Sequence, residues 1–206
     1  MHIDTFLSRL SPENRNKVLD VLNFIAFSNT QGWIAGGFLR RILENNKIFE
    51  SDIDLFFPNQ VNYDKFKDYL TSKGFKLTKE NDKNSTWLGL TKSELSEPIA
   101  VEIQLIKVKF FSEITELIDE FDFTNCMLAT NLANPQEIVH GSLTLLDIGQ
   151  KRLVVNKITY PIASLRRLIK YVKQGYYACE GCLQQLLLES FKLGEAGISQ
   201  NMGYID

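Results

Sequence analysis

Two aspartates on an apolar segment are the most chemically informative feature of the sequence. Asp52 and Asp54 lie within SDIDLFF. On an extended strand, side chains two positions apart point to the same face, roughly 6.6 Å apart along the backbone. Two carboxylates in this arrangement can hold a pair of magnesium ions. Such ions activate an attacking hydroxyl, stabilise charge on a phosphate and assist a pyrophosphate leaving group.

A glycine pair precedes these aspartates in GWIAGGFLRR. Gly36 and Gly37 stand between an apolar segment and an amphipathic one, where we expect a strand to turn into a helix. Backbone without side chains lets a triphosphate approach the amides of a helix N-terminus, whose partial positive charge favours anions. The order of strand, glycine turn, helix and acidic strand predicts a metal-dependent nucleotidyl transfer site.

A third carboxylate is expected from a later strand. Residues 99–105 alternate in character, so that the apolar residues share one face and Glu102 lies on the other. We expect Glu102 to be buried and to complete the metal site with Asp52 and Asp54, because a buried carboxylate without a partner is costly. The alternative is an edge strand with Glu102 in solvent.

The composition is that of a soluble globular protein. The chain has 206 residues, of which 44% are hydrophobic and 23% charged, enough for one domain with a small helical appendage. We find no apolar run long enough to span a bilayer and no signal peptide, so we expect a cytosolic protein without a membrane partner. Three cysteines indicate reduced thiols rather than a disulfide framework.

The net charge of −2 excludes a strongly basic nucleic-acid binder, so a polynucleotide partner would need a local basic patch. The best candidate is a C-terminal helix with interleaved basic and aromatic residues. These are Arg166, Arg167, Lys170 and Lys173, with Tyr171, Tyr176 and Tyr177. The alternative is a solvated helix face whose aromatic residues turn into the core.

Periodicity predicts an α+β fold, a mixed sheet flanked by helices. The expected strands are Trp33–Ala35, Asp52–Phe57, Phe75–Leu77, Thr86–Leu90 and Ile99–Ile106. The expected helices begin at Ser11-Pro12-Glu13, cover Phe38–Glu44 and Asn62–Ser72, and recur around Ile114–Ile118, from Phe121 through Ala129, and over Pro161–Lys173 and Cys182–Leu193. Leu143–Leu146 and Arg152–Val155 suggest a hairpin-like connection, and residues after Gly194 suggest a tail.

Several segments together resemble a known family. GWIAGGFLRR with SDIDLFF resembles the head of the tRNA nucleotidyltransferases (CCA-adding enzymes) and bacterial poly(A) polymerases, within the DNA polymerase beta-like superfamily. Residues 122–129, DFTNCMLA, are similar to the family's DFTINALA, and Leu145-Leu146-Asp147 resembles its LIDxFGG turn. Residues 167–176 resemble its neck helix, and the matches keep their order over most of residues 32–176.

This resemblance implies a nucleotidyltransferase head over residues 1–158 and a helical neck-like segment with a tail over residues 159–206. It implies an NTP substrate and two Mg²⁺ ions bound by Asp52, Asp54 and Glu102. The implied nucleotide contacts are Gly36 and Gly37 at the phosphates, Arg40 at the triphosphate, Asp122 near the ribose, and Arg167 and Lys170 on the neck-like helix.

The implied reaction transfers a nucleoside monophosphate to a hydroxyl and releases pyrophosphate. The favoured acceptor is an RNA 3′ end, that of a tRNA, because the likeness includes the neck as well as the head. A protein side chain or a small molecule is the alternative, as in antitoxin-type members of the superfamily, and a non-catalytic module that binds a nucleotide or a partner is a further one. Arg41 replaces the family's acid, Glu120-Phe121 replaces its arginine pair, and we find no Glu-Asp-x-x-Arg motif.

The Cys179-Glu180-Gly181-Cys182 segment has the spacing of a metal or redox site. Zinc normally takes four ligands, and the remaining candidates, Cys126, His2 and His140, are scattered along the chain. We therefore expect ordinary thiols at a helix end.

Overall fold

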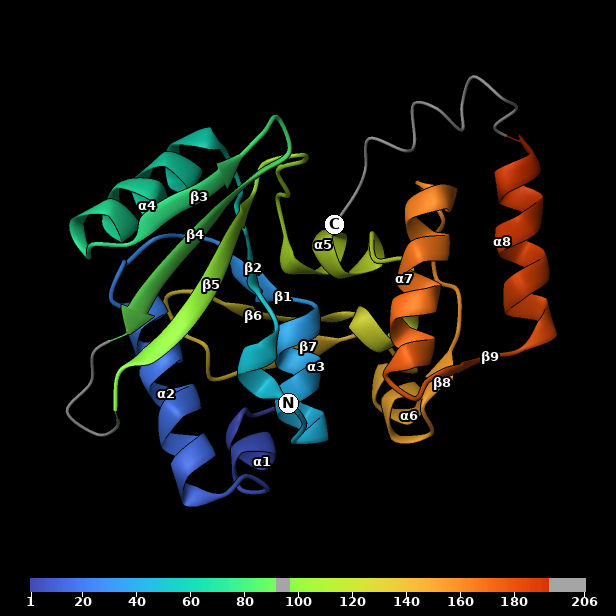
Figure 1. Ribbon diagram of the computed structural model, residues 1–206, viewed down its shortest axis with the longest axis horizontal. Coiled ribbons are helices and arrows are strands. Elements are labelled where there is room, and N and C mark those ends of the chain that lie inside the picture. The colour runs from blue at the N-terminus through green and yellow to red at the C-terminus, as the bar shows by residue number, and fades with distance from the viewer. Residues whose placement is uncertain (92–96, 193–206) are drawn as a thin grey trace. The chain divides into compact units, whose positions relative to one another are not determined.

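The computed structural model describes residues 1–91 and 97–192, which separate into two units by their internal contacts (Figure 1). Unit 1 comprises residues 1–117 and 128–139, and unit 2 comprises residues 118–127 together with the described residues from 140 onward. Each unit is described by itself. Unit 2 thus takes in more of the chain than the neck-like segment 159–206, and the division into a catalytic head and a neck stays a prediction.

Unit 1 is built on a mixed seven-stranded sheet with the strand order β3-β4-β5-β2-β1-β6-β7. The strands are β1 (Trp33–Ala35), β2 (Ile53–Phe56), β3 (Lys76–Glu80), β4 (Asn84–Thr91), β5 (Ile99–Ile106), β6 (Leu128–Asn131) and β7 (Ile138–His140). Strand β2 pairs parallel with β5 and antiparallel with β1, which places β2 in the interior of the sheet. This α+β architecture confirms the predicted fold class.

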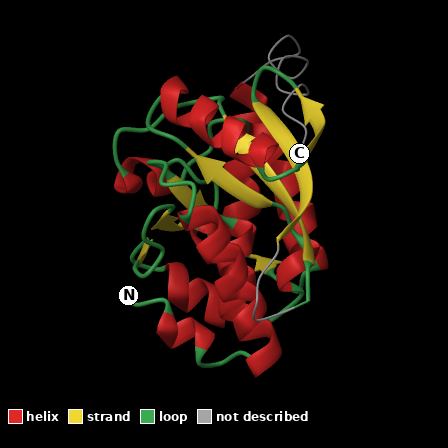
Figure 2. Ribbon diagram, turned by 90° about the vertical axis from the view of Figure 1, so that its left-hand side faces the viewer, coloured by secondary structure: helices red, strands yellow, loops and turns green. Residues whose placement is uncertain are grey.

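Helices cover one face of the β3–β5 part of this sheet (Figures 1 and 2). The helices of unit 1 are α1 (Asp4–Leu7), α2 (Pro12–Ala26), α3 (Gly37–Glu44), the 3₁₀ turn η1 (Ile48–Glu50) and α4 (Gln60–Ser72), and α5 (Ile114–Asp119) crosses into unit 2. Helix α2 begins as predicted, because the Ser11 hydroxyl accepts a hydrogen bond from the Asn14 amide at 3.2 Å. The Tyr63 hydroxyl of α4 donates to the Ser85 hydroxyl of β4 at 2.8 Å. Helix α4 therefore lies on the face of the sheet to which Ser85 points.

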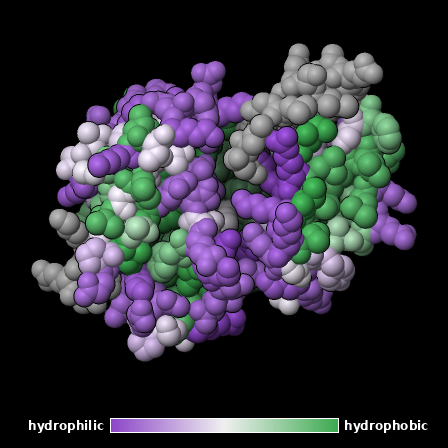
Figure 3. Space-filling view, in the orientation of Figure 1, coloured by the Kyte–Doolittle hydropathy of each residue, from purple (hydrophilic) through white to green (hydrophobic). Residues whose placement is uncertain are grey.

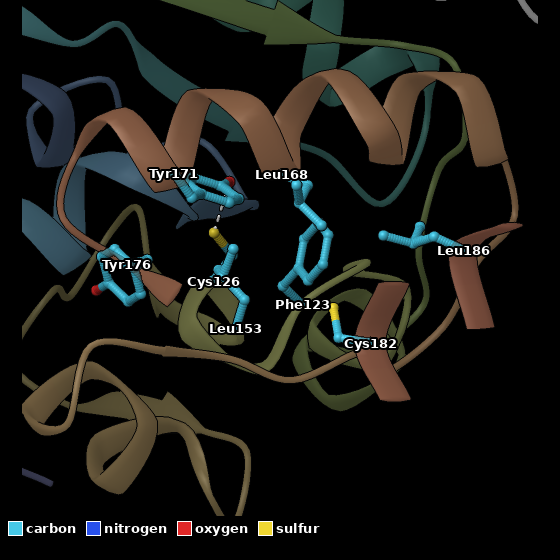
Figure 4. Close-up of a cluster of buried hydrophobic side chains, with 8 residues drawn as sticks. All are labelled: Phe123, Cys126, Leu153, Leu168, Tyr171, Tyr176, Cys182 and Leu186. Atoms are coloured by element: carbon cyan, nitrogen blue, oxygen red, sulfur yellow. Dashed lines mark hydrogen bonds between the residues drawn. The ribbon is translucent and has the colours of Figure 1, made fainter. Parts of the chain in front are cut away.

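Unit 2 is mainly helical around its own apolar core (Figure 4). Its elements are η2 (Thr124–Cys126), α6 (Thr144–Gly149), β8 (Arg152–Leu153), α7 (Pro161–Lys173), β9 (Tyr177–Ala178) and α8 (Glu180–Lys192). Phe123 packs edge-on against Tyr171 with ring centroids 5.8 Å apart, and the Tyr171 hydroxyl lies 2.9 Å from the Cys126 sulfur. Across the described residues, the helices lack the length and apolar character that crossing a membrane would require.

Two local predictions in the second half of the chain are wrong. The helix expected from Phe121 through Ala129 is instead the short η2 followed by strand β6, because residues 128–131 extend the sheet beside β1. The hairpin-like connection expected around Leu143–Leu146 is helix α6. The tail expected after Gly194 lies outside the described residues.

A buried carboxylate explains why α6 forms at that position. Asp147 is fully buried, and its two oxygens accept hydrogen bonds from the Thr124 hydroxyl at 2.6 Å and from Arg152 Nε at 3.0 Å. Asp147 therefore ties α6 to η2 and β8, and the ion pair raises the pKa of the Arg152 guanidinium. These two contacts stabilise the helical conformation of the leucine-rich segment.

A tight backbone approach at the start of β1 supports a stability prediction. A Cβ atom on Gly32 would lie 2.5 Å from the Phe56 carbonyl oxygen and 2.9 Å from Leu132. Gly32→Ala should therefore lower the free energy of unfolding by more than about 2 kcal/mol, because the pairing of β1 would have to shift. Urea denaturation followed by circular dichroism measures this change.

Gly149→Ala is the matched control, since a Cβ atom there meets nothing within 4 Å. Equal stability of the two variants would contradict the packing described for β1.

Candidate active site

The glycine turn, Gly36 and Gly37, links β1 to α3. Gly36 has φ 78° and ψ −132°, a conformation that favours glycine, and its amide donates to the Leu128 carbonyl at 3.0 Å. Helix α3 begins at Gly37, and the first amides of a helix have no intrahelical partner. A helix N-terminus thus follows directly after a buried strand, as the sequence predicted. The partial positive charge of a helix N-terminus favours an anion.

The acidic pair is Asp52 and Asp54: Asp54 lies on β2, the strand next to this turn, and Asp52 directly precedes β2. In the antiparallel pairing of β1 with β2, Asp54 stands opposite Ala35, the residue before the glycine turn. Ile53 and Leu55 are buried in the core, so the two aspartates point to the other face. Both aspartates are half-buried. Strand register therefore brings two of the predicted acids beside the predicted phosphate cradle.

Glu102 lies on the neighbouring strand but is not buried. In the parallel pairing of β2 with β5, Asp54 stands opposite Gln104, so Glu102 shares the face of the acidic pair. The alternation predicted for β5 is confirmed, whereas the expectation of burial is wrong: Glu102 is exposed, although β5 is an interior strand. The reason is that α2 and α4 cover only the opposite face of β4 and β5.

The three acids do not form a compact ligand cluster. Within residues 1–91 and 97–192, no three His, Cys, Asp or Glu side chains are close enough together to hold a metal ion. Instead, Gln104 reaches the acidic pair, and its Nε2 donates to Asp52 Oδ2 at 2.5 Å. Sequence analysis missed Gln104, yet the alternation of β5 already placed it on the same face as Glu102.

Arg40 is enclosed rather than presented to a ligand. Its side chain is 2% exposed, and Nη1 donates to Glu44 Oε2 one helical turn later at 3.2 Å. Phe38, Leu39 and Ile42 are buried on the same short helix, so α3 turns Arg40 inward with them. The prediction that Arg40 contacts a triphosphate therefore requires a rearrangement of its pairing with Glu44.

In unit 2 the structure brings two predicted nucleotide contacts together. Asp122 Oδ2 accepts a hydrogen bond from the Ser164 hydroxyl at 2.7 Å and forms an ion pair with Arg167. Lys170, one turn further along α7, is exposed. Asp122 and Arg167 thus hold the segment before η2 against α7 in unit 2, and their roles toward a nucleotide stay predictions.

The predicted mixture of basic and aromatic residues on α7 is not a surface patch. Tyr171 and Tyr176 are buried in the core of unit 2, and Arg167 is paired with Asp122. Tyr177 alone of the three tyrosines is exposed. The structure therefore favours the alternative, a helix that turns its aromatic side into the core.

The fold places the protein in a known structural class. It is similar to a solved CCA-adding enzyme in complex with ATP, with a TM-score of 0.65 at 16% identity, over 98% of this chain and 50% of that one. It is also similar to the Thermotoga maritima CCA-adding enzyme complexed with tRNA_CCA, with a TM-score of 0.62 at 19% identity, over 98% of this chain and 49% of that one. The protein therefore has the nucleotidyltransferase fold.

The chain belongs to the Gabija anti-defense 2 family, because the sequence model of that family matches residues 2–151. A relative from Bacillus phage SPbetaL7, named Gabija anti-defense 2, is 28% identical over 152 residues. That match covers 73% of this chain and 35% of the relative. The chain thus spans about a third of the length of this relative and about half of the solved enzymes.

The cysteines of unit 2 support a labelling prediction. Burial raises the pKa of the Cys182 thiol to about 11, and the charge of Cys179 makes a smaller contribution. Cys126 is also buried, whereas Cys179 is exposed. Because the thiolate is the reactive form, a raised pKa keeps Cys182 protonated and slow to react at pH 8. Labelling with an aromatic disulfide reagent at pH 8 should show one fast equivalent.

Cys179→Ser should abolish the fast phase. Rapid modification of Cys182 in that variant would contradict the burial described for α8.

Proposed function

We propose that the protein transfers a nucleoside monophosphate from an NTP to a hydroxyl acceptor and releases pyrophosphate. The observation that supports this most strongly is the register of β1 and β2, which sets Asp54 opposite Ala35 and so beside the glycine turn. In the reaction the acceptor oxygen bonds to the α-phosphorus, while the bond between the α- and β-phosphates breaks. The hydroxyl loses its proton and pyrophosphate departs with the electron pair of the broken bond.

The donor chemistry of the site suits magnesium. Mg²⁺ prefers oxygen ligands and is usually held by one or two carboxylates together with substrate phosphates, so a compact cage of three acids is not required. Asp52 and Asp54 would hold the ion, and Glu102 on the same face would contribute as the third acid. When bound, the ion supplies the positive charge that activates the hydroxyl and stabilises the phosphate.

The protein's own residues would position the nucleotide. The amides at the start of α3 would bind the triphosphate, and Gly36 and Gly37 would let it approach because no Cβ intervenes. The resemblance to CCA-adding enzymes suggests further nucleotide contacts from Asp122, Arg167 and Lys170. Arg40 would contact the triphosphate only after its ion pair with Glu44 breaks.

We propose a protein hydroxyl as the acceptor in preference to an RNA 3′ end. The acidic pair lies on the open face, defined as the face of β4, β5 and β2 opposite α2 and α4, and this face also carries the apolar side chains of Leu88 and Leu90, which are 47% and 53% exposed. Figure 3 shows hydrophobic surface over this part of the sheet in the orientation of Figure 1. Exposed leucines suit a protein surface better than a phosphate backbone.

The family supports the same choice. The phage relative is named for acting against a defence called Gabija, so a component of that defence is a reasonable target of the transferred nucleotide. RNA remains the second candidate because the likeness to CCA-adding enzymes covers both units, and one of those solved enzymes is bound to tRNA_CCA.

Nucleotide transfer can be tested directly. The protein is incubated with each α-³²P-labelled NTP, Mg²⁺ and an extract containing the Gabija defence, and labelled protein and RNA are separated. Asp52→Asn and Asp54→Asn should each lower incorporation more than about 100-fold, because the metal would lose a charged ligand. Asp82→Asn, at an exposed position, is the control and should retain activity.

Label in protein supports the proposed acceptor, and label in RNA replaces it by the second candidate. NTP binding without incorporation into either would contradict an enzyme and support a non-catalytic binding module.

The open face gives a separate prediction about the acceptor. Leu88→Ser and Leu90→Ser should each raise KM for the acceptor protein about fivefold or more, because each removes apolar area where the acceptor would bind. Both variants should leave the affinity for the NTP unchanged. Leu77→Ser is the matched control: Leu77 is 43% exposed on the same sheet and pairs with Trp87, on the helix-covered face. Equal KM values for all three variants would exclude the open face as the acceptor surface.

A further inference from the structure

We propose that Gln104 is a positioning residue that orients Asp52 toward the metal ion, an inference that rests on the proposed function. Gln104 lies at the centre of the open face, opposite Asp54 on one side and Thr86 on the other. Gln104 contacts the acidic pair through a hydrogen bond of 2.5 Å from its Nε2 to Asp52 Oδ2.

Both ends of the Gln104 amide are engaged. Its Oε1 accepts a hydrogen bond from Asn84 Nδ2 of β4 at 3.4 Å, while its Nε2 donates to Asp52. An ionised carboxylate can only accept a hydrogen bond, so the Gln104 amide nitrogen faces Asp52 and its oxygen is left to accept from Asn84. The resulting chain of hydrogen bonds runs from Asn84 on β4 through Gln104 on β5 to Asp52, the residue directly before β2.

The other Asp52 oxygen has a weaker partner. Asp52 Oδ1 accepts from the neighbouring Ser51 hydroxyl at 3.3 Å, a longer contact than the one from Gln104. Gln104 is therefore the stronger donor and holds Oδ2. Oδ1, with the weaker contact, is the oxygen that would bind a cation. Carboxylates that bind metals are commonly oriented by hydrogen bonds of this kind.

The chemistry of the side chain at position 104 matters. A lysine there would neutralise Asp52 and repel a cation, and a glutamate would repel Asp52 when no metal is present. The glutamine amide donates a hydrogen bond without adding charge, so the acidic pair keeps its full attraction for a divalent ion. This combination is suited to positioning a metal ligand.

The test is metal binding to the full chain, with Mn²⁺ as the probe and free Mn²⁺ followed by electron paramagnetic resonance. Gln104→Met keeps the length of the side chain and removes the donor, and it should weaken Mn²⁺ binding roughly 10- to 100-fold. Thr86→Val is the matched control, because Thr86 is the cross-strand neighbour of Gln104 on the same face, and its affinity should equal that of the wild type. The melting temperature of each metal-free variant is measured in parallel.

The outcomes separate this inference from the proposed function. A lower melting temperature of Gln104→Met with unchanged Mn²⁺ affinity would show a structural role and overturn the inference, as would tighter Mn²⁺ binding, which would make Gln104 a competitor of the metal. Asp52→Asn is titrated alongside. If it binds Mn²⁺ as the wild type does, or if the wild type has no specific site, both the inference and the proposed function fail.

Discussion

Antiparallel pairing of β1 with β2 is the constraint on which the candidate site depends. It aligns Ala35 with Asp54, so the chain can leave β1 through a glycine turn at the same level where β2 presents its acids. Apolar alternation makes this register stable, because a slip by one residue would turn Ile53 and Leu55 out of the core and the aspartates into it. Burial of two aliphatic side chains thereby determines which way the carboxylates point.

Unit 2 combines its apolar core with polar contacts between segments. Asp147 joins α6 to η2 and β8, and Asp122, two residues before η2, joins that segment to α7. The segments around these two aspartates are among those that resemble motifs of nucleotide-adding enzymes. In unit 2 the carboxylates of these motifs serve packing, and any role toward a nucleotide would be additional to it.

The sequence predicted those elements whose signals are local. The N-cap of α2, the strands β1 and β5 and helix α7 follow from capping, alternation and helical periodicity within a few residues. Strand β6 was missed because its identity comes from pairing with β1, far away in the sequence. The exposure of Glu102 was equally beyond local reasoning, because alternation shows which residues share a face and not whether a helix covers that face.

We propose that a metal ion and a triphosphate meet between the acidic pair and the glycine turn. A crystal structure of the protein soaked with Mn²⁺ and a non-hydrolysable NTP tests it most directly. We predict an anomalous manganese peak beside Asp52 and Asp54, with the triphosphate against the first amides of α3. Nucleotide bound elsewhere, or a manganese peak away from β2, would contradict the account.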